Sequence, residues 1–395
     1  MIKPTILIIL SVIVTLMSIS CDDYEISDKQ ADSFLKFYGS GLEDEGMKVI
    51  ATDEGYLIMG NLENPGSGKD ICIIRTDKFG NTLAPVTTYG GEWDDLGYVI
   101  KPNSSGYIIA GSTQKEEQGD LDVFILQINS TGDALWSKSY GSSYDDEAFD
   151  LLVLENNNIV VTGYTDGSDG QEKDILFFEI NSSGDSLYFN HIGSDYDDVA
   201  YSFVQKENSY FFVGYSDEHT VSNQQLMKSI LVWQWDGIGS LINYSSYFTS
   251  LGAGSEAVAI KALNQNEYIL SVVQPTQGNG SQIYLVKMDA SGHLIWQKSF
   301  GERTVNIAND FTIYDESIYV IGTSTNGEVS GDMMILKTGL SGDNPLYFYA
   351  GDGTSYTGNG LDFTPDGGYI VTGANITNNN SVITLCKLDA EGLLR

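Results

Sequence analysis

Residues 89–142 read YGGEWDDLGYVIKPNSSGYIIAGSTQKEEQGDLDVFILQINSTGDALWSKSYGS, and this stretch decides the fold. It contains four short segments rich in β-branched and aromatic residues, LGYVI, GYIIAGST, DVFILQIN and ALWSKSY. Gly, Asn, Asp and Ser bound each segment, as is typical of strands joined by turns. The stretch therefore predicts four consecutive strands, termed A to D here, and no helix.

The same pattern recurs along the rest of the chain. Its first position aligns with residues spaced 50 to 56 apart, which are Tyr38, Tyr89, Tyr140, Ile192, Phe248, Phe300 and Ala350. We number the repeats that begin there units 1 to 7. Strand C is apolar at successive positions, as in DILFFEIN, so we expect it to be covered on both faces. Four-stranded units of this length, repeated several times, are typical of a β-propeller.

The two ends of the repeat array complement each other. Unit 7 stops at CKLDAEGLLR, after strand C and its turn, and has no strand D. A segment with the strand D pattern, SFLKFYG at residues 33–39, precedes unit 1. We therefore predict an all-β fold, a seven-bladed β-propeller of four-stranded blades over residues 33–395. The N-terminal strand completes the last blade and closes the ring.

These motifs resemble the seven-bladed propeller repeats of secreted and lipid-anchored bacterial proteins. The consensus of that family is YGG-x-x-x-DD, GGYI-x-G, D-x-x-L-x-K-x-D-x-x-G and W-x-K-x-YGG. Unit 2 carries it as YGGEWDD, GYIIAG and LWSKSYG. The resemblance covers residues 33–395 and implies the architecture. The resemblance does not indicate a particular function, because propellers serve as enzymes, receptors and scaffolds.

Residues 1–21, MIKPTILIILSVIVTLMSISC, have the layout of a secretory signal. The apolar run from Ile6 to Ile19 is shorter than the roughly 20 apolar residues of a membrane-spanning helix. The SISC ending resembles a bacterial lipobox, which implies that Cys21 is lipidated and becomes the mature N-terminus. Ser18 departs from this pattern, which usually has Leu there. An ordinary signal peptide and an uncleaved anchor are the alternatives.

Acyl chains on Cys21 would hold the protein on a membrane. Residues 22–32, DDYEISDKQAD, would then be a short acidic tether. Acidic residues directly after the cysteine resemble the sorting signals of some Gram-negative lipoproteins. We therefore expect a cell-envelope protein at the outer membrane or the cell surface, anchored by lipid.

The composition narrows the classes of partner. The chain has 20 Lys+Arg against 54 Asp+Glu, a formal net charge of −34. Nucleic acid is excluded as a partner, because its binding depends on neutralising phosphates, and cations become a plausible class of ligand. After Cys21 only Cys72 and Cys386 remain, so no disulfide framework supports the fold. Both stand in strand C at positions of the same parity, so their side chains point to the same side of their blades and cannot meet across one interface. We therefore predict two buried free thiols.

Pairs of carboxylates stand where one unit passes into the next. In a propeller, the crossing from strand D to strand A and the loop from B to C lie on one face, so this face should be acidic. The candidate residues for binding a ligand or cation on it are Asp44, Asp94, Asp95, Asp145, Asp146, Asp197 and Asp198.

Two interpretations of these pairs compete. Carboxylates and carbonyls could hold Ca²⁺, the one cofactor that we consider. Alternatively, each Asp accepts hydrogen bonds from backbone N–H groups and fixes a turn that every blade needs. Units 5 to 7 lack the pairs and have FTSLGAGSEAV, FGERTVNIAND and AGDGTSYTGNG instead. This asymmetry fits either a ligand groove or drift among the repeats.

The sequence contains no G-x-S-x-G elbow, H-E-x-x-H motif or phosphate loop. The leading hypothesis is a monomeric, non-catalytic binding or scaffold module for a protein or glycan partner. The alternative is an enzyme acting on a polysaccharide, with Asp95, Asp146 and Asp198 as acid and base. Near-equivalent environments argue against that alternative, because a catalytic pair needs differently tuned carboxyls.

Overall fold

The computed structural model describes residues 33–116, 119–166, 172–220, 226–236, 241–245, 251, 254–327, 331–351, 354–378 and 380–394. The predicted signal peptide, with Cys21, and the predicted tether lie outside the described residues. Within the described ranges every regular element is a β-strand, which confirms the all-β class. No helix in these ranges is long and apolar enough to cross a membrane.

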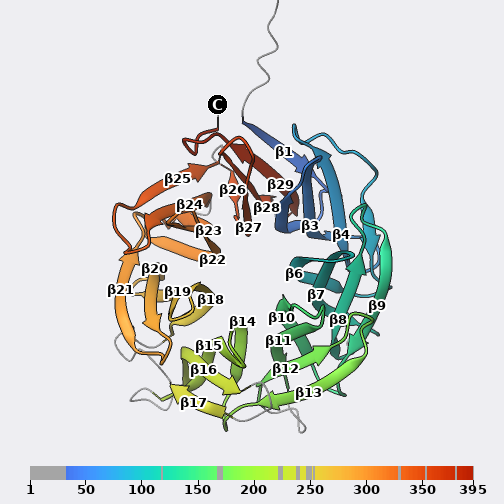
Figure 1. Cartoon of the computed structure of the whole chain (residues 1–395). Helices are drawn as coiled ribbons and strands as arrows, with labels where there is room; N and C mark the ends of the chain where they lie inside the picture. Colours follow the sequence, from blue (N-terminus) through green and yellow to red (C-terminus); the bar gives the residue numbers. More distant parts are fainter. Residues whose placement is uncertain are drawn as a thin grey trace, which may run out of the picture. The chain divides into compact units, whose positions relative to one another are not determined.

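Each of units 1 to 6 forms four antiparallel strands, ordered from the centre of residues 33–395 outward, and the N-terminal strand pairs with the outer edge of unit 7 (Figure 1). The innermost strands are β2 (Glu45–Ala51), β6 (Asp95–Asn103), β10 (Asp146–Val153), β14 (Asp198–Lys206), β18 (Glu256–Asn264), β22 (Val305–Tyr314) and, after the short β26 (Ser355–Tyr356), β27 (Gly360–Phe363). The second strands are β3 (Gly55–Glu63), β7 (Gly106–Gln114), β11 (Ile159–Thr165), β15 (Ser209–Thr220), β19 (Glu267–Thr276), β23 (Ser317–Thr325) and β28 (Tyr369–Thr377).

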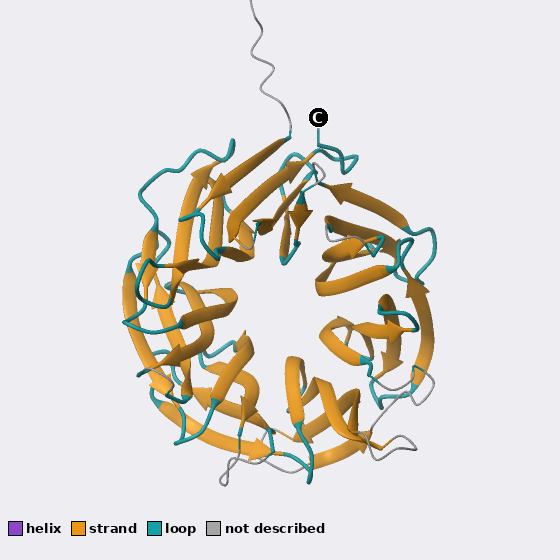
Figure 2. Ribbon diagram, turned by 180° about the vertical axis from the view of Figure 1, so that it is seen from behind, coloured by secondary structure: helices purple, strands orange, loops and turns teal. Residues whose placement is uncertain are grey.

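The outer half of each unit completes its sheet. The third strands are β4 (Lys69–Asp77), β8 (Leu121–Ile128), β12 (Asp174–Ile180), β16 (Leu226–Asp236), β20 (Gly280–Asp289), β24 (Asp332–Gly339) and β29 (Asn380–Leu388). The outermost strands of units 1 to 6 are β5 (Thr87–Tyr89), β9 (Ala134–Tyr140), β13 (Ser186–Ile192), β17 (Leu241–Ser245), β21 (Leu294–Phe300) and β25 (Leu346–Ala350). The outermost strand beside unit 7 is β1 (Phe34–Tyr38). Figure 2 shows the sheets set around the same centre, seen from behind. Four-stranded sheets set around one centre are the architecture of a β-propeller.

Two connections between strands depart from the simple four-strand pattern. The N-terminal strand β1 pairs with β29 of unit 7, with Phe34 opposite Lys387 and Tyr38 opposite Ile383. The strands of units 5 and 6 belong to one eight-stranded sheet. A single parallel bridge, Ser281 to Val305, joins its two halves.

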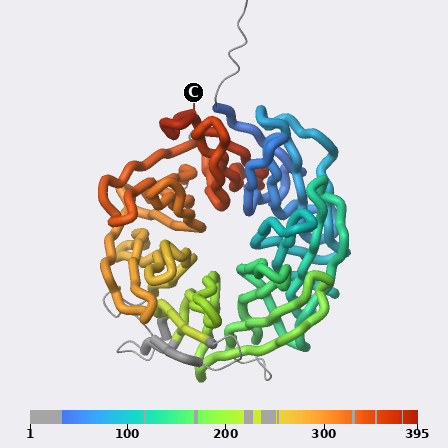
Figure 3. Tube along the Cα trace, in the orientation of Figure 1, coloured from blue at the N-terminus to red at the C-terminus, as the bar shows by residue number. Residues whose placement is uncertain are grey.

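The hydrophobic core consists of clusters that lie between neighbouring units. Val123 of unit 2 and Phe178 of unit 3, for example, belong to one buried cluster. Another cluster joins Val49 of unit 1 to Ile370 and Leu385 of unit 7, at the two ends of the chain (Figure 3). Full burial of such a side chain stabilises the fold by roughly 1.5–3 kcal/mol. Each interface between units therefore supplies part of the stability.

The two cysteines lie in different clusters of this core. Cys72 packs in the cluster between units 1 and 7, and Cys386 in the cluster between units 6 and 7. Both are free and buried, and burial raises the pKa of each thiol to about 12. The prediction of two buried free thiols is confirmed.

A β-bulge recurs near the start of the inner strands. On β6 the register with β7 shifts between Gly97 and Val99, so Tyr98 has no partner across the ladder. The equivalent bulged residues on β2, β10, β14, β18 and β22 are Met47, Phe149, Tyr201, Val258 and Asn309. A bulge bends its strand and redirects a side chain. Here all six bulged residues line the central hollow described below.

A glycine on the second strand makes room for the bulge. Gly111 lies opposite Gly97, and a Cβ at Gly111 would collide with the carbonyl oxygen of Leu96. The glycines that would meet the equivalent carbonyl of their own units are Gly60, Gly163, Gly214, Gly322 and Gly373. The repeated glycine in GYIIAGS therefore reflects a close approach of two backbones.

Candidate functional site

The second aspartate of each crossing is buried at the start of an inner strand. Asp44, Asp146 and Asp198 are 0% exposed, and Asp95 is 3% exposed. Each carboxylate accepts a backbone N–H from the residue four positions earlier. These donors are Ser40 at 2.6 Å, Gly91 at 2.7 Å, Ser142 at 2.7 Å and Ser194 at 2.6 Å. The four carboxylates thus close the same turn in units 1 to 4.

The first aspartate of each pair joins neighbouring units. Asp94 Oδ1 accepts the N–H of Lys69 at 2.8 Å, at the start of the third strand of the preceding unit. The matching bonds run from Leu121 to Asp145 and from Lys173 to Asp197, each at 2.9 Å. These three carboxylates therefore contribute to the packing of one unit on the next.

Burial raises the pKa of Asp95, Asp146 and Asp198 above the ordinary aspartate range. Hydroxyl groups of Thr113, Thr165 and Ser216 respectively oppose this rise as hydrogen-bond donors. Among the described residues, no group of three or more His, Cys, Asp or Glu could hold a metal ion. Binding of Ca²⁺ or of a partner by the acidic face stays a prediction.

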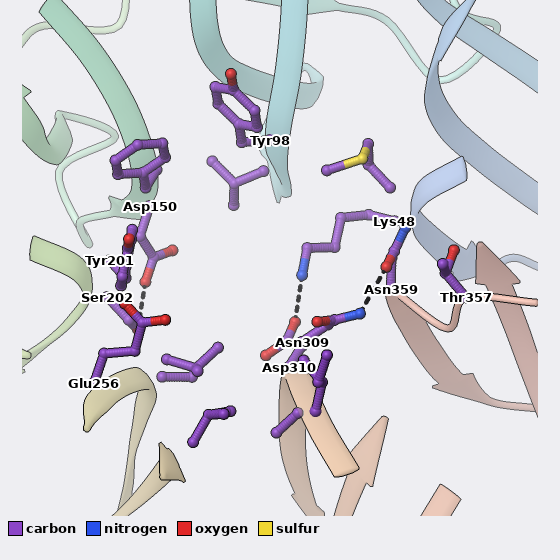
Figure 4. A pocket seen from close by; sticks show the side chains of 18 of the residues that line it. Lys48, Tyr98, Asp150, Tyr201, Ser202, Glu256, Asn309, Asp310, Thr357 and Asn359 are labelled. Carbon is purple, nitrogen blue, oxygen red and sulfur yellow. Dashed lines mark hydrogen bonds and ion pairs between the residues drawn. The ribbon is translucent and has the colours of Figure 1, made fainter. Parts of the chain in front are cut away.

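A hollow of about 750 Å³ lies among the inner strands, and the predicted aspartate pairs do not line it. Most of its wall comes from the inner strands β2, β6, β10, β14, β18 and β22, at and near the bulged positions, together with Thr357 and Asn359 (Figure 4). This volume is in the range of small-molecule binding sites. The hollow is the strongest candidate site in the part of the chain that the structure describes.

One side of the hollow is aromatic. The rings of Tyr98 and Phe149 lie 5.4 Å apart between centroids, and those of Phe149 and Tyr201 lie 5.3 Å apart. Glu147 accepts hydrogen bonds from the hydroxyl groups of Tyr98 at 2.8 Å and Tyr164 at 2.7 Å. Burial and this carboxylate together raise the pKa of Tyr98, so its hydroxyl stays protonated. We call Tyr98, Phe149 and Tyr201 the aromatic wall.

The side formed by units 6, 7 and 1 is polar. Asn309 Nδ2 donates to Asn359 Oδ1 at 2.9 Å (Figure 4). Asn359 Nδ2 in turn donates to Glu45 Oε1 at 2.7 Å. Thr357 lies beside this chain of amides. Amide groups can donate and accept hydrogen bonds at once, so this side can bind a ligand rich in hydroxyl groups.

Charged side chains form a layer across the hollow, and we call Lys48, Lys101, Asp150, Lys261 and Asp310 the charged layer. Lys48 Nζ lies 2.5 Å from Asp310 Oδ2. Lys261 Nζ lies 4.0 Å from Asp310 Oδ1, and Lys101 Nζ lies 3.9 Å from Asp150 Oδ1. Asp150 also accepts a hydrogen bond from the hydroxyl of Ser202 at 2.8 Å. Three cations and two anions therefore meet near the centre.

The charged layer perturbs its own members. Although burial opposes ionisation, Lys48 and Lys261 hold the pKa of Asp310 well below its usual range. The nearby Lys261 and burial lower the pKa of Lys101. The pKa of Lys261 is raised despite burial, because Asp310 and Asp150 stabilise its charge. The ionisation of each member therefore depends on its neighbours. The surroundings of Lys101 stabilise its positive charge less than those of Lys261 do.

A second hollow of about 460 Å³ shares Lys101, Asp150 and Lys261 with the first. Its other lining residues, such as Pro102, Leu152 and Gln205, follow further along the same inner strands. Lys101, Asp150 and Lys261 therefore border both hollows, whereas Lys48 and Asp310 line only the first.

Sequence reasoning missed the aromatic wall and the charged layer. It placed the candidate site at the crossings, where a motif repeats, whereas the hollow is lined by positions that differ from unit to unit. A signal was present, because charges interrupt apolar runs just after the bulged position: Asp150 in AFDLL and Asp310 in ANDFT directly follow it, and Lys101 in VIKP and Lys261 in AIKA stand two residues further along.

Comparisons with known proteins add little beyond the fold. No protein-family model matches the chain, and no curated protein matches its sequence. A similar solved structure is the β-propeller domain of the Trilobed protease from Pyrococcus furiosus, with 13% identity, a TM-score of 0.49 and coverage of 89% of this chain and 94% of that chain.

Two further solved structures are more distant. For Pyrococcus horikoshii acylaminoacyl peptidase the identity is 10%, the TM-score 0.45 and the coverage 86% of this chain and 52% of that chain. For a thermostable family-43 glycoside hydrolase the identity is 10%, the TM-score 0.39 and the coverage 68% of this chain and 96% of that chain. Likenesses this distant carry no argument about function.

Proposed function

We propose that this chain is a lipid-anchored cell-envelope protein whose seven-bladed β-propeller binds a glycan in its central hollow without transforming it. We count seven blades because only a single bridge joins the two halves of the eight-stranded sheet, so each half is taken as a separate blade. Closure of the ring is supported by the pairing of β1 with β29 and by the buried cluster shared by units 1 and 7.

Lipid anchoring is supported by the signal-like segment that ends at Cys21 and by the acidic residues that follow it. A net charge of −34 suits an exterior domain that stays soluble beside an anionic membrane. We place the protein at the outer membrane or cell surface of a Gram-negative bacterium, as a monomer.

The single observation that carries the binding function is the two-sided hollow. The aromatic wall offers ring faces with few rotatable bonds, and the opposite side offers the linked amides of Asn309 and Asn359. A sugar has both an apolar face of C–H groups and a rim of hydroxyls, so it complements these two sides together. A protein partner bound at the acidic face is the alternative.

Binding without catalysis is favoured by where the carboxyls lie. Cleavage of a glycosidic bond needs one carboxyl that is protonated near neutral pH and a second that is ionised, both facing the substrate. Asp95, Asp146 and Asp198 have raised pKa values but are buried in the crossings and do not line the hollow. Within the hollow, Asp310 is ion-paired with Lys48.

The test is a panel of neutral and acidic oligosaccharides, screened by thermal shift and measured by calorimetry against wild type and Phe149→Ala. Loss of the central ring of the aromatic wall should weaken saccharide binding about tenfold, or about 1.4 kcal/mol. Phe189→Ala is the matched control, because Phe189 is 46% exposed on the outermost strand β13.

Far-ultraviolet circular dichroism of both variants checks that the sheets remain. Binding that Phe149→Ala leaves unchanged would show that the ligand lies elsewhere. A panel in which no saccharide binds would contradict the glycan function and favour a protein partner.

A further inference from the structure

Two ammonium groups of the charged layer line the hollow without a close acceptor among the residues that the structure describes. Lys101 Nζ and Lys261 Nζ approach the nearest aspartate oxygens only to 3.9 Å and 4.0 Å. A direct N–H···O hydrogen bond needs about 2.7–3.2 Å. Lys48, by contrast, lies 2.5 Å from the same Asp310 that Lys261 approaches. Asp310 is therefore committed to Lys48, and the two other lysines retain donors for a ligand.

The charged layer carries one positive charge more than negative, because it holds three lysines and two aspartates. This local excess is unusual in a chain with a net charge of −34. The lysine side chains are 37% exposed at Lys101 and 29% exposed at Lys261, so both can be reached from the hollow. An anion placed between them would relieve the repulsion of two neighbouring ammonium groups.

The other carboxylates of the hollow leave this excess in place. Glu45 accepts the hydrogen bond of Asn359, and Glu256 is paired with Lys228 at 3.0 Å. Both residues stand at the start of their inner strands, before the bulge, whereas Lys101 and Lys261 follow the bulge. Glu45 and Glu256 therefore lie at a different depth along the strands from Lys101 and Lys261.

We propose that the ligand of the central hollow carries a carboxylate that binds between Lys101 and Lys261, and that this ligand is an acidic sugar of the uronic-acid type. This inference rests on the proposed glycan-binding function. The pyranose ring would lie against the aromatic wall, its hydroxyls would meet Asn309 and Asn359, and its carboxylate would accept charge-assisted hydrogen bonds from the two lysines. A free carboxylate without a ring would use only the last of these contacts.

The experiment uses sugars that differ only in the charged group. Glucuronate is compared with glucose, and galacturonate with galactose, by ligand-observed NMR and calorimetry on the full mature domain. The acid of each pair should bind at least about tenfold more tightly, as expected for one charge-assisted hydrogen bond that the neutral sugar lacks. Acetate is included as the carboxylate without a ring, and it should bind more weakly than either acid.

Lys101→Gln and Lys261→Gln should each reduce affinity for the acid about tenfold more than affinity for the neutral sugar. The matched control is Lys298→Gln, since Lys298 pairs with Asp343 on the outer surface at 2.6 Å. Thermal denaturation of each variant confirms that it is folded at the assay temperature.

Equal affinity for acid and neutral sugars, or a preference that both lysine variants retain, overturns the carboxylate inference while leaving glycan binding intact. Binding of acetate as tight as that of the acids would also overturn it, because the ring would then contribute nothing. Failure of every sugar to bind overturns the inference together with the proposed function.

Discussion

Asp146 and Asp150 stand four residues apart on the same inner strand, yet their surroundings differ completely. Asp146 is fully buried in the crossing and accepts the backbone N–H of Ser142. Asp150 faces the hollow, where it accepts the hydroxyl of Ser202 and lies near Lys101. The bulge at Phe149 separates the two positions and turns the strand between them.

The two positions also behave differently across the repeats. The Asp146 position holds an aspartate in units 1 to 4, each bonded in the same way. The Asp150 position, counted in the same register, is filled from unit 1 to unit 6 by Lys48, Val99, Asp150, Ser202, Ala259 and Asp310. Repetition therefore marks residues that serve the blade, and variation marks residues that can serve a ligand.

The largest expected effect comes from removing the space that the bulge needs. In Gly163→Ala the new Cβ would collide with the carbonyl oxygen of Glu147, a backbone atom that cannot move without distorting the bulge. We expect a loss of about 3 kcal/mol or more in the free energy of unfolding, measured by urea denaturation. Phe149 should then lose its place in the hollow, and saccharide binding should fall with it.

Gly91→Ala is the control for this change. A Cβ at Gly91 meets only Asp95 Oδ2, at an ordinary contact distance of 3.8 Å. It should change stability by less than about 0.5 kcal/mol. Equal effects of Gly163→Ala and Gly91→Ala would show that the close approach beside the bulge does not matter.

Much of the fold follows from the sequence, because repetition amplifies weak local signals. One unit alone would leave the strands in GYIIAGST and DVFILQIN uncertain, whereas several aligned copies share the same turns and the same apolar pattern. The complementary ends of the array predicted the partner of the N-terminal strand, and β1 does pair with β29. The unit boundaries come from Gly and Asp residues whose roles are local.

The candidate site did not follow from the sequence for the same reason. The contacts of Lys48 with Asp310 join residues 262 positions apart, and no pattern within one unit encodes them. The bulge also changes which residues face the centre, so counting by a period of two after Phe149 assigns the wrong face. Only the assembled sheets bring the aromatic wall and the charged layer together.

A smaller effect is expected at the crossing itself. Asp198→Ala removes the acceptor for the backbone N–H of Ser194 at 2.6 Å and for its hydroxyl at 2.7 Å, at a site that is fully buried. Loss of two hydrogen bonds to a buried carboxylate should reduce the free energy of unfolding by about 2–3 kcal/mol. Asp195→Ala is the matched control in the same crossing, because Asp195 is exposed. Thermal denaturation of both variants, with and without a bound saccharide, separates stability from binding. A large loss of ligand affinity in folded Asp198→Ala would give the crossing a functional role.

The smallest effect is expected in the charged layer. Asp310→Asn removes the partner of Lys48 at 2.5 Å, where both side chains keep about a quarter of their surface exposed, 24% and 26%. Because solvent screens the pair in part, we expect a loss of only about 1–2 kcal/mol at neutral pH. Asp343→Asn is the control, since its pair with Lys298 has 63% and 38% exposed side chains and should contribute less than about 0.5 kcal/mol.

The pH dependence of stability distinguishes the two kinds of aspartate. The pKa of Asp310 is lowered in the folded state, so its contribution is fully present above the unfolded value of about 3.9 and is lost as the pH falls below it. The pKa values of Asp95, Asp146 and Asp198 are raised, so the folded state binds their protons more tightly. Stability from these three should rise as the pH falls through their folded pKa values toward about 3.9.

Urea denaturation of wild type and Asp310→Asn along a pH series measures both contributions at once. As the pH falls through the raised folded pKa values of the crossing aspartates toward about 3.9, the two proteins should gain stability in parallel, because both keep these aspartates. Below about 3.9 their curves should converge, because wild type loses the ion pair that the variant already lacks. Curves that stay parallel through this lower range would mean that Lys48 and Lys261 do not hold Asp310 ionised. The aspartates of the crossings and of the hollow would then differ in location but not in the direction of their pKa shifts.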